Sequence, residues 1–283
     1  KGLTNCYARQ TQNHRIYYFL CAQKQHMNYA VCVVPVSPLR ADAAHRSEMV
    51  SQLLFGESGH VLETTSDFIR IRCTHDQYEG WCQRSQLVLL EQLPATNGSA
   101  VYISDHTDQA TINGITAYIP MGAPVIAPAN TDMRLGPYRI NYLVGSPWDA
   151  LSATPTAAAI EARAARLLNT PYLWGGRSVF GIDCSGFTQL VFRFFHYPLR
   201  RDAWMQAEQG TPVNDLQEAR CGDLAFFDNE KGKITHVGLL LNNKEIIHSS
   251  GKVRKDSIDV QGIINSDTGE RTHRLKLIRR YFE

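Results

Sequence analysis

Short apolar runs alternate with turn-forming residues through the first half of the chain, and this pattern predicts many short β-strands. The runs lie at residues 31–36, 60–63, 68–73, 81–90, 117–120, 124–127 and 138–144. Gly, Pro, Asn and Asp separate them at close intervals, which is typical of small barrels or sandwiches. Loop-like stretches at 93–99 and 146–155 mark two boundaries. We therefore predict an N-terminal segment with a small all-β barrel over 1–93 and a second barrel over 94–155.

Beyond these strands the period of the apolar positions changes to that of helices. Residues 156–168 form an Ala-rich run, with Thr156 as a candidate N-cap. From Cys184 onward, apolar residues recur with the i, i+3, i+4 spacing of an amphipathic helix. Strand-like runs follow at 223–228, 235–241 and 245–249. Helices followed by consecutive strands predict an α+β domain with an antiparallel sheet over 156–283.

Composition narrows the classes of function. The 29 basic and 27 acidic residues leave a net charge of +2, too balanced for a nucleic-acid-binding surface. No apolar run reaches the roughly 18 residues that a membrane-spanning helix needs. The sequence printed here opens at Lys1 on polar residues, so we expect a periplasmic or cell-envelope protein after removal of a signal peptide, or else a cytoplasmic one. Cys73 and Cys82 flank a predicted turn and are the best candidates for a disulfide, with buried free thiols as the alternative.

Cys184 is the first candidate for chemistry, because it opens the predicted amphipathic helix behind a possible N-cap, Asp183. Free N–H groups and a partial positive charge at a helix N-terminus lower the pKa of a thiol and favour the reactive thiolate. The same N–H groups suit the oxyanion of a tetrahedral intermediate. Position alone also fits a small buried cysteine with no chemical role.

Two histidines on successive predicted strands add a base and an orienting group. If a three-residue loop joins Leu241 to Glu245, His236 and His248 become diagonal neighbours on one face, roughly 7–8 Å apart or less. A two-residue loop would send them to opposite faces. In the first register His236 takes the proton of Cys184, and His248 accepts a hydrogen bond from its other ring nitrogen. Zinc is the rival use, but neither H-E-x-x-H nor paired C-x-x-C spacing is present, so we expect no metal and no other cofactor.

Five ordered motifs resemble the NlpC family of papain-like cell-wall cysteine peptidases. They are PYLWGG at 171–176, DCSGF at 183–187, GDLAFF at 222–227, THVG at 235–238 and IHS at 247–249. The resemblance covers about residues 156–283 and implies a Cys-His-His catalytic set of Cys184, His236 and His248. It also implies that the substrate cleft is lined by Tyr172, Trp174, Asp183, Ser185 and Asp202.

In the first half, LLFGE at 53–57, the predicted strand at 68–73 and YEGW at 78–81 resemble a bacterial SH3-like domain that ends near residue 93. Residues 94–155 resemble a divergent second domain of this kind. Two such domains before an NlpC domain resemble enzymes that cut γ-D-glutamyl–diamino acid bonds in peptidoglycan stem peptides with a free N-terminal L-alanine. In those enzymes an acidic residue and a tyrosine of the first SH3-like domain bind the alanine amine. Glu48 and Tyr78 are the candidates here, with Glu57 and Glu79 as alternatives to Glu48. A carboxylate suits this place because an ammonium taken out of water needs a paired charge.

The sequence therefore predicts a hydrolase: a monomeric cysteine endopeptidase that acts on stem peptides without a cofactor. A wall-binding module with an inactive catalytic domain is one alternative, and a thiol acyltransferase or amidase on another substrate is a second. Each binding residue also has a structural alternative: Tyr172, Trp174 and Tyr78 as core or interface aromatics, Asp183 and Asp202 as helix caps, and Glu48 as a solvated acid.

Overall fold

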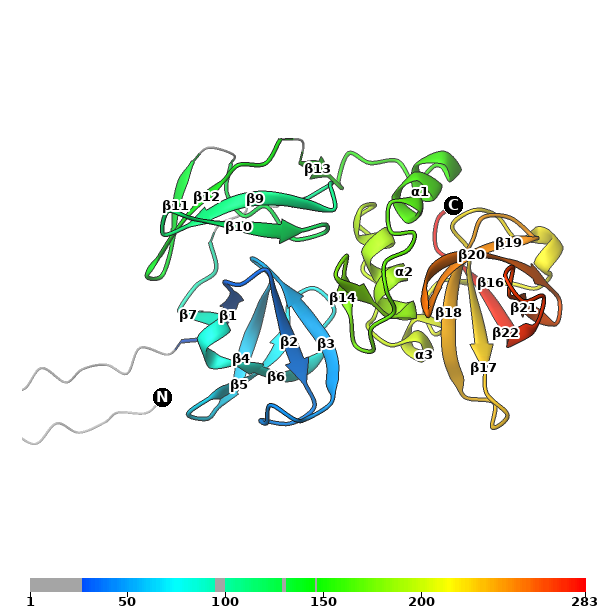
Figure 1. Ribbon diagram of the computed structural model, residues 1–283, viewed down its shortest axis with the longest axis horizontal. Helices are drawn as coiled ribbons and strands as arrows, with labels where there is room; N and C mark the ends of the chain where they lie inside the picture. Colours follow the sequence, from blue (N-terminus) through cyan, green and yellow to red (C-terminus); the bar gives the residue numbers. More distant parts are fainter. Residues whose placement is uncertain (1–26, 95–99, 129–130, 146) are drawn as a thin grey trace, which may run out of the picture.

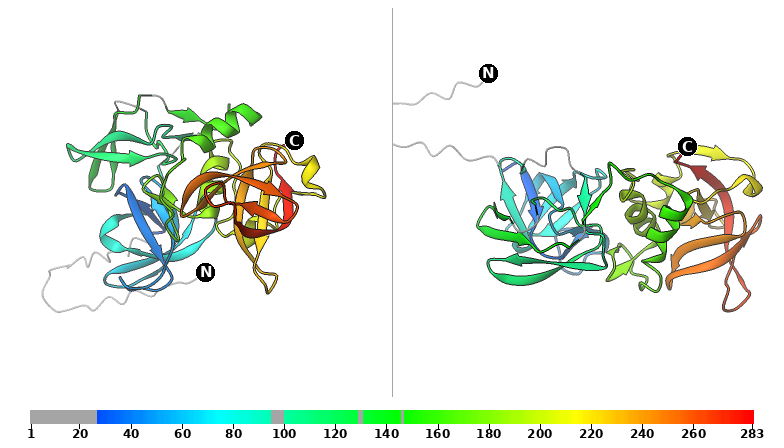
Figure 2. Two further views of the ribbon diagram at one scale, coloured as in Figure 1. Left: turned by 45° about the vertical axis from the view of Figure 1, so that its right-hand side comes forward. Right: turned by 90° about the horizontal axis from the view of Figure 1, so that it is seen from above.

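The structure is a computed structural model that describes residues 27–94, 100–128, 131–145 and 147–283. Figure 1 shows two all-β units next to each other and a third unit that combines helices with a sheet. The helices lie between the two all-β units and the C-terminal sheet, and Figure 2 shows the same order from above. Within the described ranges, no helix has the length and apolar character needed to cross a membrane.

The first unit is a bent antiparallel sheet with strand order β3-β2-β6-β5-β4-β1-β7. Its elements are β1 (Tyr29–Cys32), β2 (Val36–Arg40), β3 (Met49–Leu54), β4 (Ser58–Thr64), β5 (Phe68–Cys73), β6 (Glu79–Gln83), the 3-10 helix η1 (Arg84–Gln86) and β7 (Leu87–Leu90). In β5 the buried Ile69 and Ile71 alternate with the exposed Arg70 and Arg72, so one face of the strand covers the core. Two predicted strands are interrupted: 31–36 at the irregular 33–35, and 81–90 at η1.

The candidate disulfide between Cys73 and Cys82 is not formed, and the alternative of buried free thiols is correct for both residues. Cys82 lies opposite Ile69 in the β5–β6 ladder, four residues before Cys73, so the two side chains are not cross-strand neighbours. Burial raises the pKa of Cys82 to about 12 and that of Cys73 well above its ordinary value. Both cysteines therefore act as small apolar core residues.

The second unit consists of a four-stranded sheet, β10-β9-β12-β11, and a two-stranded ribbon of β8 and β13. Its strands are β8 (Val101–Tyr102), β9 (Thr107–Ile112), β10 (Ile115–Pro120), β11 (Asp132–Leu135), β12 (Tyr138–Tyr142) and β13 (Trp148–Asp149). The predicted strand at 124–127 is reduced to an isolated bridge between Pro124 and Tyr102. Leu54 and Phe55 of the first unit share one apolar core with Ile119 and Ile140 of the second, so the two units pack directly against each other.

The third unit has the predicted α+β composition. Its elements are α1 (Ala157–Ala165), β14 (Arg177–Ser178), β15 (Gly181–Ile182), α2 (Cys184–Arg193), α3 (Ala203–Gln206), β16 (Thr211–Val213), the 3-10 helix η2 (Leu216–Glu218), β17 (Leu224–Asp228), β18 (Ile234–Leu240), β19 (Glu245–Ser250), β20 (Lys252–Asp259), β21 (Gly262–Ile264) and β22 (Arg271–Arg280). The strand order is β16-β22-β17-β18-β19-β20-β21, and an additional β22–β21 pairing closes the sheet into a barrel. The Thr156 side chain caps α1 by accepting a hydrogen bond from the Ala159 amide, as predicted.

The register of the β18–β19 hairpin is the one that the catalytic hypothesis requires. Leu239 pairs with Ile247, Leu240 pairs with Ile246, and the Leu241 amide donates to the Glu245 carbonyl at 2.9 Å. The loop between Leu241 and Glu245 therefore has three residues. This hairpin packs against α2, so its two histidines and the start of that helix belong to the same region of the molecule.

Candidate active site

His236 and His248 form the start of a chain of hydrogen-bonded groups. Nε2 of His236 lies 2.8 Å from Nδ1 of His248, and Nε2 of His248 lies 2.9 Å from Oδ2 of Asp256 on β20. A carboxylate can only accept, so Nε2 of His248 carries a proton and its Nδ1 is the acceptor. His236 then donates through Nε2–H, which leaves its Nδ1 unprotonated. These hydrogen bonds thus hold His236 in the tautomer whose free Nδ1 can accept a proton.

Asp256 is a member of this site that the sequence analysis missed. It stands diagonal to His248 across the β19–β20 ladder, where His248 pairs with Arg254 and Ile246 pairs with Asp256. Burial raises its pKa, but hydrogen bonds from His248, the Ser266 amide and Arg254 together bring it far below the ordinary value. Asp256 is therefore ionised at neutral pH. The tight turn at Gly251, with φ of +69°, sets this register and was the signal available in the sequence.

The base itself is buried and neutral. His236 is 6% exposed, and burial together with His248 and His273 holds its pKa well below 6.5. A neutral imidazole at physiological pH is ready to accept a proton.

Cys184 begins α2 as predicted, but its thiol is less acidic than a helix N-terminus suggests. Burial first, and then the charge of Asp183, raise the pKa of Cys184 to about 12, while the backbone amides of Val237 and Ser185 act in the opposite direction. The thiol thus lies beside the residue that follows His236 in β18. Among the contacts of the described residues, no hydrogen bond joins Cys184 to His236. Burial therefore favours the neutral thiol over the thiolate at this position.

The Asp183 carboxylate, which precedes α2, accepts hydrogen bonds from nearby backbone amides. Its Oδ1 accepts the helix-capping bond from the Gly186 amide at 2.7 Å, and its Oδ2 accepts from the Gly175 amide at 2.9 Å. The buried Arg201 pairs with Asp183 and also donates to Ser185 Oγ at 2.8 Å. The cap alternative is therefore correct for Asp183, and the predicted substrate contacts of Asp183 and Ser185 stay predictions.

The first unit and the catalytic unit meet at the predicted cleft through two side-chain pairs. The Tyr78 hydroxyl lies 3.3 Å from both carboxylate oxygens of Asp202, and Trp174 Nε1 donates to Glu48 Oε1 at 2.7 Å. Asp202 precedes α3 but makes no side-chain cap bond there, and its carboxylate contacts Tyr78 of the first unit instead. Trp174 is 61% exposed, which is unusual for an aromatic with only a core role.

Burial adjusts the acidity of the groups around this cleft. It raises the pKa of Tyr78 to about 12, and the nearby Asp202 carboxylate acts in the same direction. Burial likewise raises the pKa of Asp202 above its ordinary value, although Arg201 opposes this. Tyr172 is half-buried, and burial followed by Cys184 and Asp183 raises its pKa to about 12. Both tyrosines therefore act as neutral hydrogen-bonding groups.

Glu57 and Glu79, the two alternatives to Glu48, are engaged elsewhere. Glu79 pairs with Arg70 and Arg72 on the surface of the first unit. Glu57 is buried and pairs with Arg177 and Arg193 of the catalytic unit. Of the three acids, Glu48 is the one that touches a predicted cleft residue.

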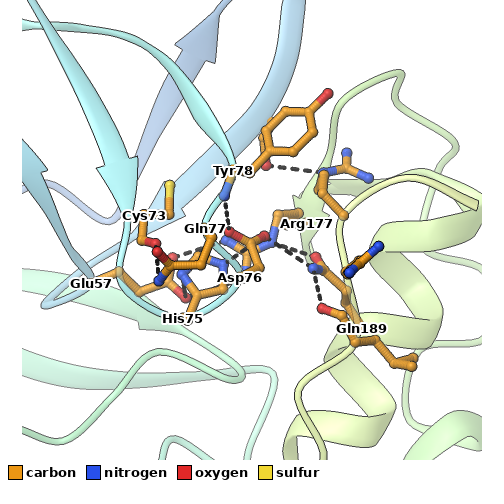
Figure 3. A network of polar contacts seen from close by, with 12 residues as sticks. Glu57, Cys73, His75, Asp76, Gln77, Tyr78, Arg177 and Gln189 are labelled. Carbon is orange, nitrogen blue, oxygen red and sulfur yellow. Dashed lines mark hydrogen bonds and ion pairs between the residues drawn. The ribbon is translucent and has the colours of Figure 1, made fainter. Parts of the chain in front are cut away.

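A polar network joins the first unit to the catalytic unit, and Figure 3 shows it from close by. Arg177 on β14 donates to Glu57 Oε2 at 2.9 Å and to the Gln52 carbonyl at 2.6 Å. Gln189 on α2 donates to Asp76 Oδ2 at 3.0 Å and accepts from Arg177 Nε at 3.0 Å. Although burial raises it, Arg177, His75 and Arg193 bring the pKa of Glu57 well below its ordinary value. The interface thus contains a buried cluster of ion pairs, in which Glu57 is shared by Arg177 and Arg193.

Close backbone approach also ties the two units together. Gly175 has a φ of +75°, and a Cβ placed there would lie 2.3 Å from the Met49 carbonyl oxygen on β3. Only glycine can adopt this positive φ with so little room beside its Cα atom. The Gly-Gly pair of the PYLWGG motif therefore brings the loop at 171–176 against the first unit at Met49, the residue after Glu48.

Two groups of side chains are composed of metal-binding residue types. His236, His248 and His273 have ligand atoms within 4.8 Å of one another, as do Cys73, His75 and Asp76. The rings of His236 and His273 are stacked with an interplanar angle of 26°, so their in-plane lone pairs do not converge on one ion. In the second group Asp76 accepts bonds from Gln189 and the Tyr78 amide. Neither arrangement is that of a preformed metal centre, and Cys184 belongs to neither.

Comparisons with known proteins agree with this geometry. Residues 169–272 match the NlpC/P60 family, and residues 39–87 match the bacterial dipeptidyl-peptidase Sh3 domain. A γ-D-glutamyl-L-lysine dipeptidyl-peptidase of Bacillus subtilis is 30% identical over 222 residues, which cover 70% of this chain and 71% of that protein. Dipeptidyl-peptidase 6 of Lysinibacillus sphaericus is 26% identical over 82% of this chain and 92% of that protein.

The fold is shared with a solved structure of the same architecture. The crystal structure of an NlpC/P60 family protein from Bacillus cereus superposes with a TM-score of 0.75 at 20% identity, covering 90% of this chain and 100% of that one. The all-β region is therefore SH3-like, and the third unit has the NlpC/P60 fold. On these grounds the chain belongs to the NlpC/P60 family of cysteine peptidases.

Proposed function

We propose that the protein is a cysteine endopeptidase that hydrolyses the γ-D-glutamyl–L-diamino acid bond of peptidoglycan stem peptides with a free N-terminal L-alanine. The observation that carries this proposal is the chain from Asp256 through His248 to His236, beside the helix that begins at Cys184. The names of the relatives supply the bond, since they are dipeptidyl-peptidases for γ-D-glutamyl-L-lysine.

The geometry supports a two-stage acyl transfer. In the first stage Cys184 Sγ attacks the γ-carbonyl carbon of D-glutamate while Nδ1 of His236 takes the thiol proton. The tetrahedral intermediate collapses, the C–N bond breaks, and the amine of the diamino acid leaves with that proton. In the second stage His236 removes a proton from water, which attacks the thioester and releases the γ-carboxyl product and the free thiol.

The amine of L-alanine would bind between the first unit and the catalytic unit. Glu48 and Asp202 bring two carboxylates to this rim from opposite sides, and Tyr78 supplies a hydroxyl. An ammonium beside Asp202 would stabilise its charged form and so reverse the effect of burial on its pKa. An acylated amine loses this charge, so the pocket would select short peptides released from the wall.

The test compares L-Ala-γ-D-Glu-diaminopimelate with its N-acetyl derivative, using the intact protein and Cys184→Ala. Release of diaminopimelate from the free-amine peptide alone, by the intact protein alone, supports the proposal. Equal turnover of both peptides would remove the amine pocket. No turnover of either would favour a wall-binding module with an inactive catalytic unit. The L-lysine peptide, assayed in parallel, decides which diamino acid is preferred.

The substrate class also bears on location and assembly. A peptidoglycan-derived substrate is consistent with a protein of the periplasm or cell envelope, and the cytoplasm is the alternative. The proposal includes a monomer, because both sides of the cleft come from one chain. Fractionation of cells and the mass of the purified protein in solution test these two points.

A further inference from the structure

His273 on β22 covers one face of the histidine that acts as base. Its ring centroid lies 4.1 Å from that of His236, and the planes differ by 26°. His248 stands edge-on to the His236 ring, with 5.0 Å between the centroids and 84° between the planes. On another side, Phe227 lies 5.7 Å from His236 in a tilted arrangement. The base is thus enclosed by aromatic rings, a geometry that restricts rotation about its side-chain bonds.

His273 also separates the site from solvent. It lines an open surface pocket of about 650 Å³ together with residues 260–261 and 271–275. Behind it His248 is 1% exposed, whereas His273 is half-buried. A smaller side chain at position 273 would connect the pocket to the His236–His248 hydrogen bond. Water at that bond would compete for its donor and acceptor and weaken it.

The hydrogen bonding of His273 leaves its ring free for this packing role. Its Nδ1 lies 2.8 Å from Thr272 Oγ1 on the surface side, and among the described residues neither ring nitrogen bonds to His236 or His248. The contact with the base is therefore made by the ring face. Such a contact fixes the plane of the partner ring and carries no proton.

We propose that His273 is a positioning residue for the catalytic base: its ring holds the plane of His236 and shields the His236–His248 hydrogen bond from water. The proposal deepens the function proposed above, since it rests on His236 being the base. With the ring plane held, Nε2–H stays directed at His248 and Nδ1 stays directed away from it, toward the cleft. Without the stack His236 would populate other rotamers, and misplacement of a catalytic group costs about 10²-fold.

Burial and the neighbouring His248 favour a neutral ring at His273. Burial first, and then His248, lower the pKa of His273 to about 4, while Asp256 opposes them. The neighbouring groups are His236 on β18, His248 on β19 and Asp256 on β20. Arg271 and Arg274 of its own strand line the same pocket, and they pair with Asp259 and Asp228. A neutral ring can lie on the imidazolium that forms during catalysis without repulsion.

The test uses four variants of the full chain: His273→Ala, His273→Leu, His273→Phe and the control Lys276→Ala. Lys276 is on the same strand and half-exposed, and its nearest acid is Asp228 at 3.5 Å. We measure kcat and KM on the peptide, the alkylation rate of Cys184 against pH, and the melting temperature. Alkylation needs no substrate, so it reports on the base even if the proposed peptide is not cleaved.

We expect His273→Ala and His273→Leu to lower kcat by about 10- to 100-fold with KM within about twofold, and to slow alkylation at neutral pH. His273→Phe restores the ring face and should recover kcat to within about threefold, while Lys276→Ala changes neither quantity. Retention of wild-type kcat and alkylation by His273→Leu would overturn the proposal. So would an equal loss in the Phe and Leu variants, because a ring would then give no advantage. If His273→Ala fails to fold, the Leu–Phe comparison decides alone.

Discussion

Replacing Glu57 by Gln tests how the first SH3-like unit is held against the catalytic unit. The substitution keeps the size of the side chain and removes its charge. Glu57 is 1% exposed at its side chain, and Arg177 and Arg193 are 5% and 13% exposed. Two guanidinium groups would then stay buried without their shared counter-ion. Removing one partner of a buried ion pair costs about 3–5 kcal/mol of the free energy of unfolding.

The assay is urea unfolding followed by tryptophan fluorescence, with Glu79→Gln as the matched control. Glu79 also pairs with two arginines, but these pairs lie on the surface. Exposed pairs contribute about 0–1 kcal/mol, so the control should change little. Adding Arg177→Met to Glu57→Gln removes one of the stranded charges and should recover part of the loss.

The pH dependence of the free energy of unfolding tests the role of Glu57 independently. The folded protein lowers the pKa of Glu57 well below 4.5, so the unfolded chain takes up the proton first as pH falls. The stabilisation is complete above the unfolded pKa of about 4.3 and is lost as pH falls from there toward the folded value. The gap between wild type and Glu57→Gln should therefore narrow below about pH 4.3. A cost no larger than that of Glu79→Gln, or a gap that is constant with pH, would refute the reasoning.

Three further outcomes follow from the site. Asp256→Asn should lower kcat by about 10²-fold or more, because an amide no longer dictates the tautomer of His248. It should also lower the melting temperature, because Arg254 loses its buried counter-ion; near wild-type kcat in the folded variant would exclude the role in the site. The rate of Cys184 alkylation should rise with pH without a plateau below about pH 8.5, the pKa of a free thiol, since burial raises the pKa of this thiol to about 12; an early plateau would indicate a preformed thiolate. Gly175→Ala should destabilise the protein by about 1–3 kcal/mol and raise KM. The control is Gly114→Ala, because Gly114 has a φ of +81° but open space around it. This control should cost only the backbone strain and leave KM unchanged.

The local parts of the site were predictable from sequence because they depend on neighbouring residues. The helix start at Cys184 followed from a cap and an apolar period, and the facing of His236 and His248 followed from the length of one loop. Asp256 required the register of a third strand, which in turn depends on the turn at Gly251. Only Val253 and Ile258 of β20 are apolar, so no alternating apolar pattern marks this strand in the sequence.

The remaining errors concern burial, which a linear pattern does not report. The helix N-terminus suggested an acidic thiol at Cys184, but complete burial beside Asp183 raises its pKa instead. Similarly, Glu57 was an alternative to Glu48 because both are acids of the first unit. Only the packing of β14 against that unit shows that Glu57 faces two arginines while Glu48 faces Trp174.

The shared apolar core of the two SH3-like units has a mechanical consequence. Leu54 and Phe55 join the first unit to the second. Trp148 joins the second unit to the catalytic one by donating from Nε1 to the Phe194 carbonyl at 2.6 Å, and Glu57 joins the first to the catalytic one through Arg177. Three bodies linked in a closed triangle have no hinge axis left. The second unit then acts as a brace, and a cleft supported on two sides can discriminate between peptides without having to close around them.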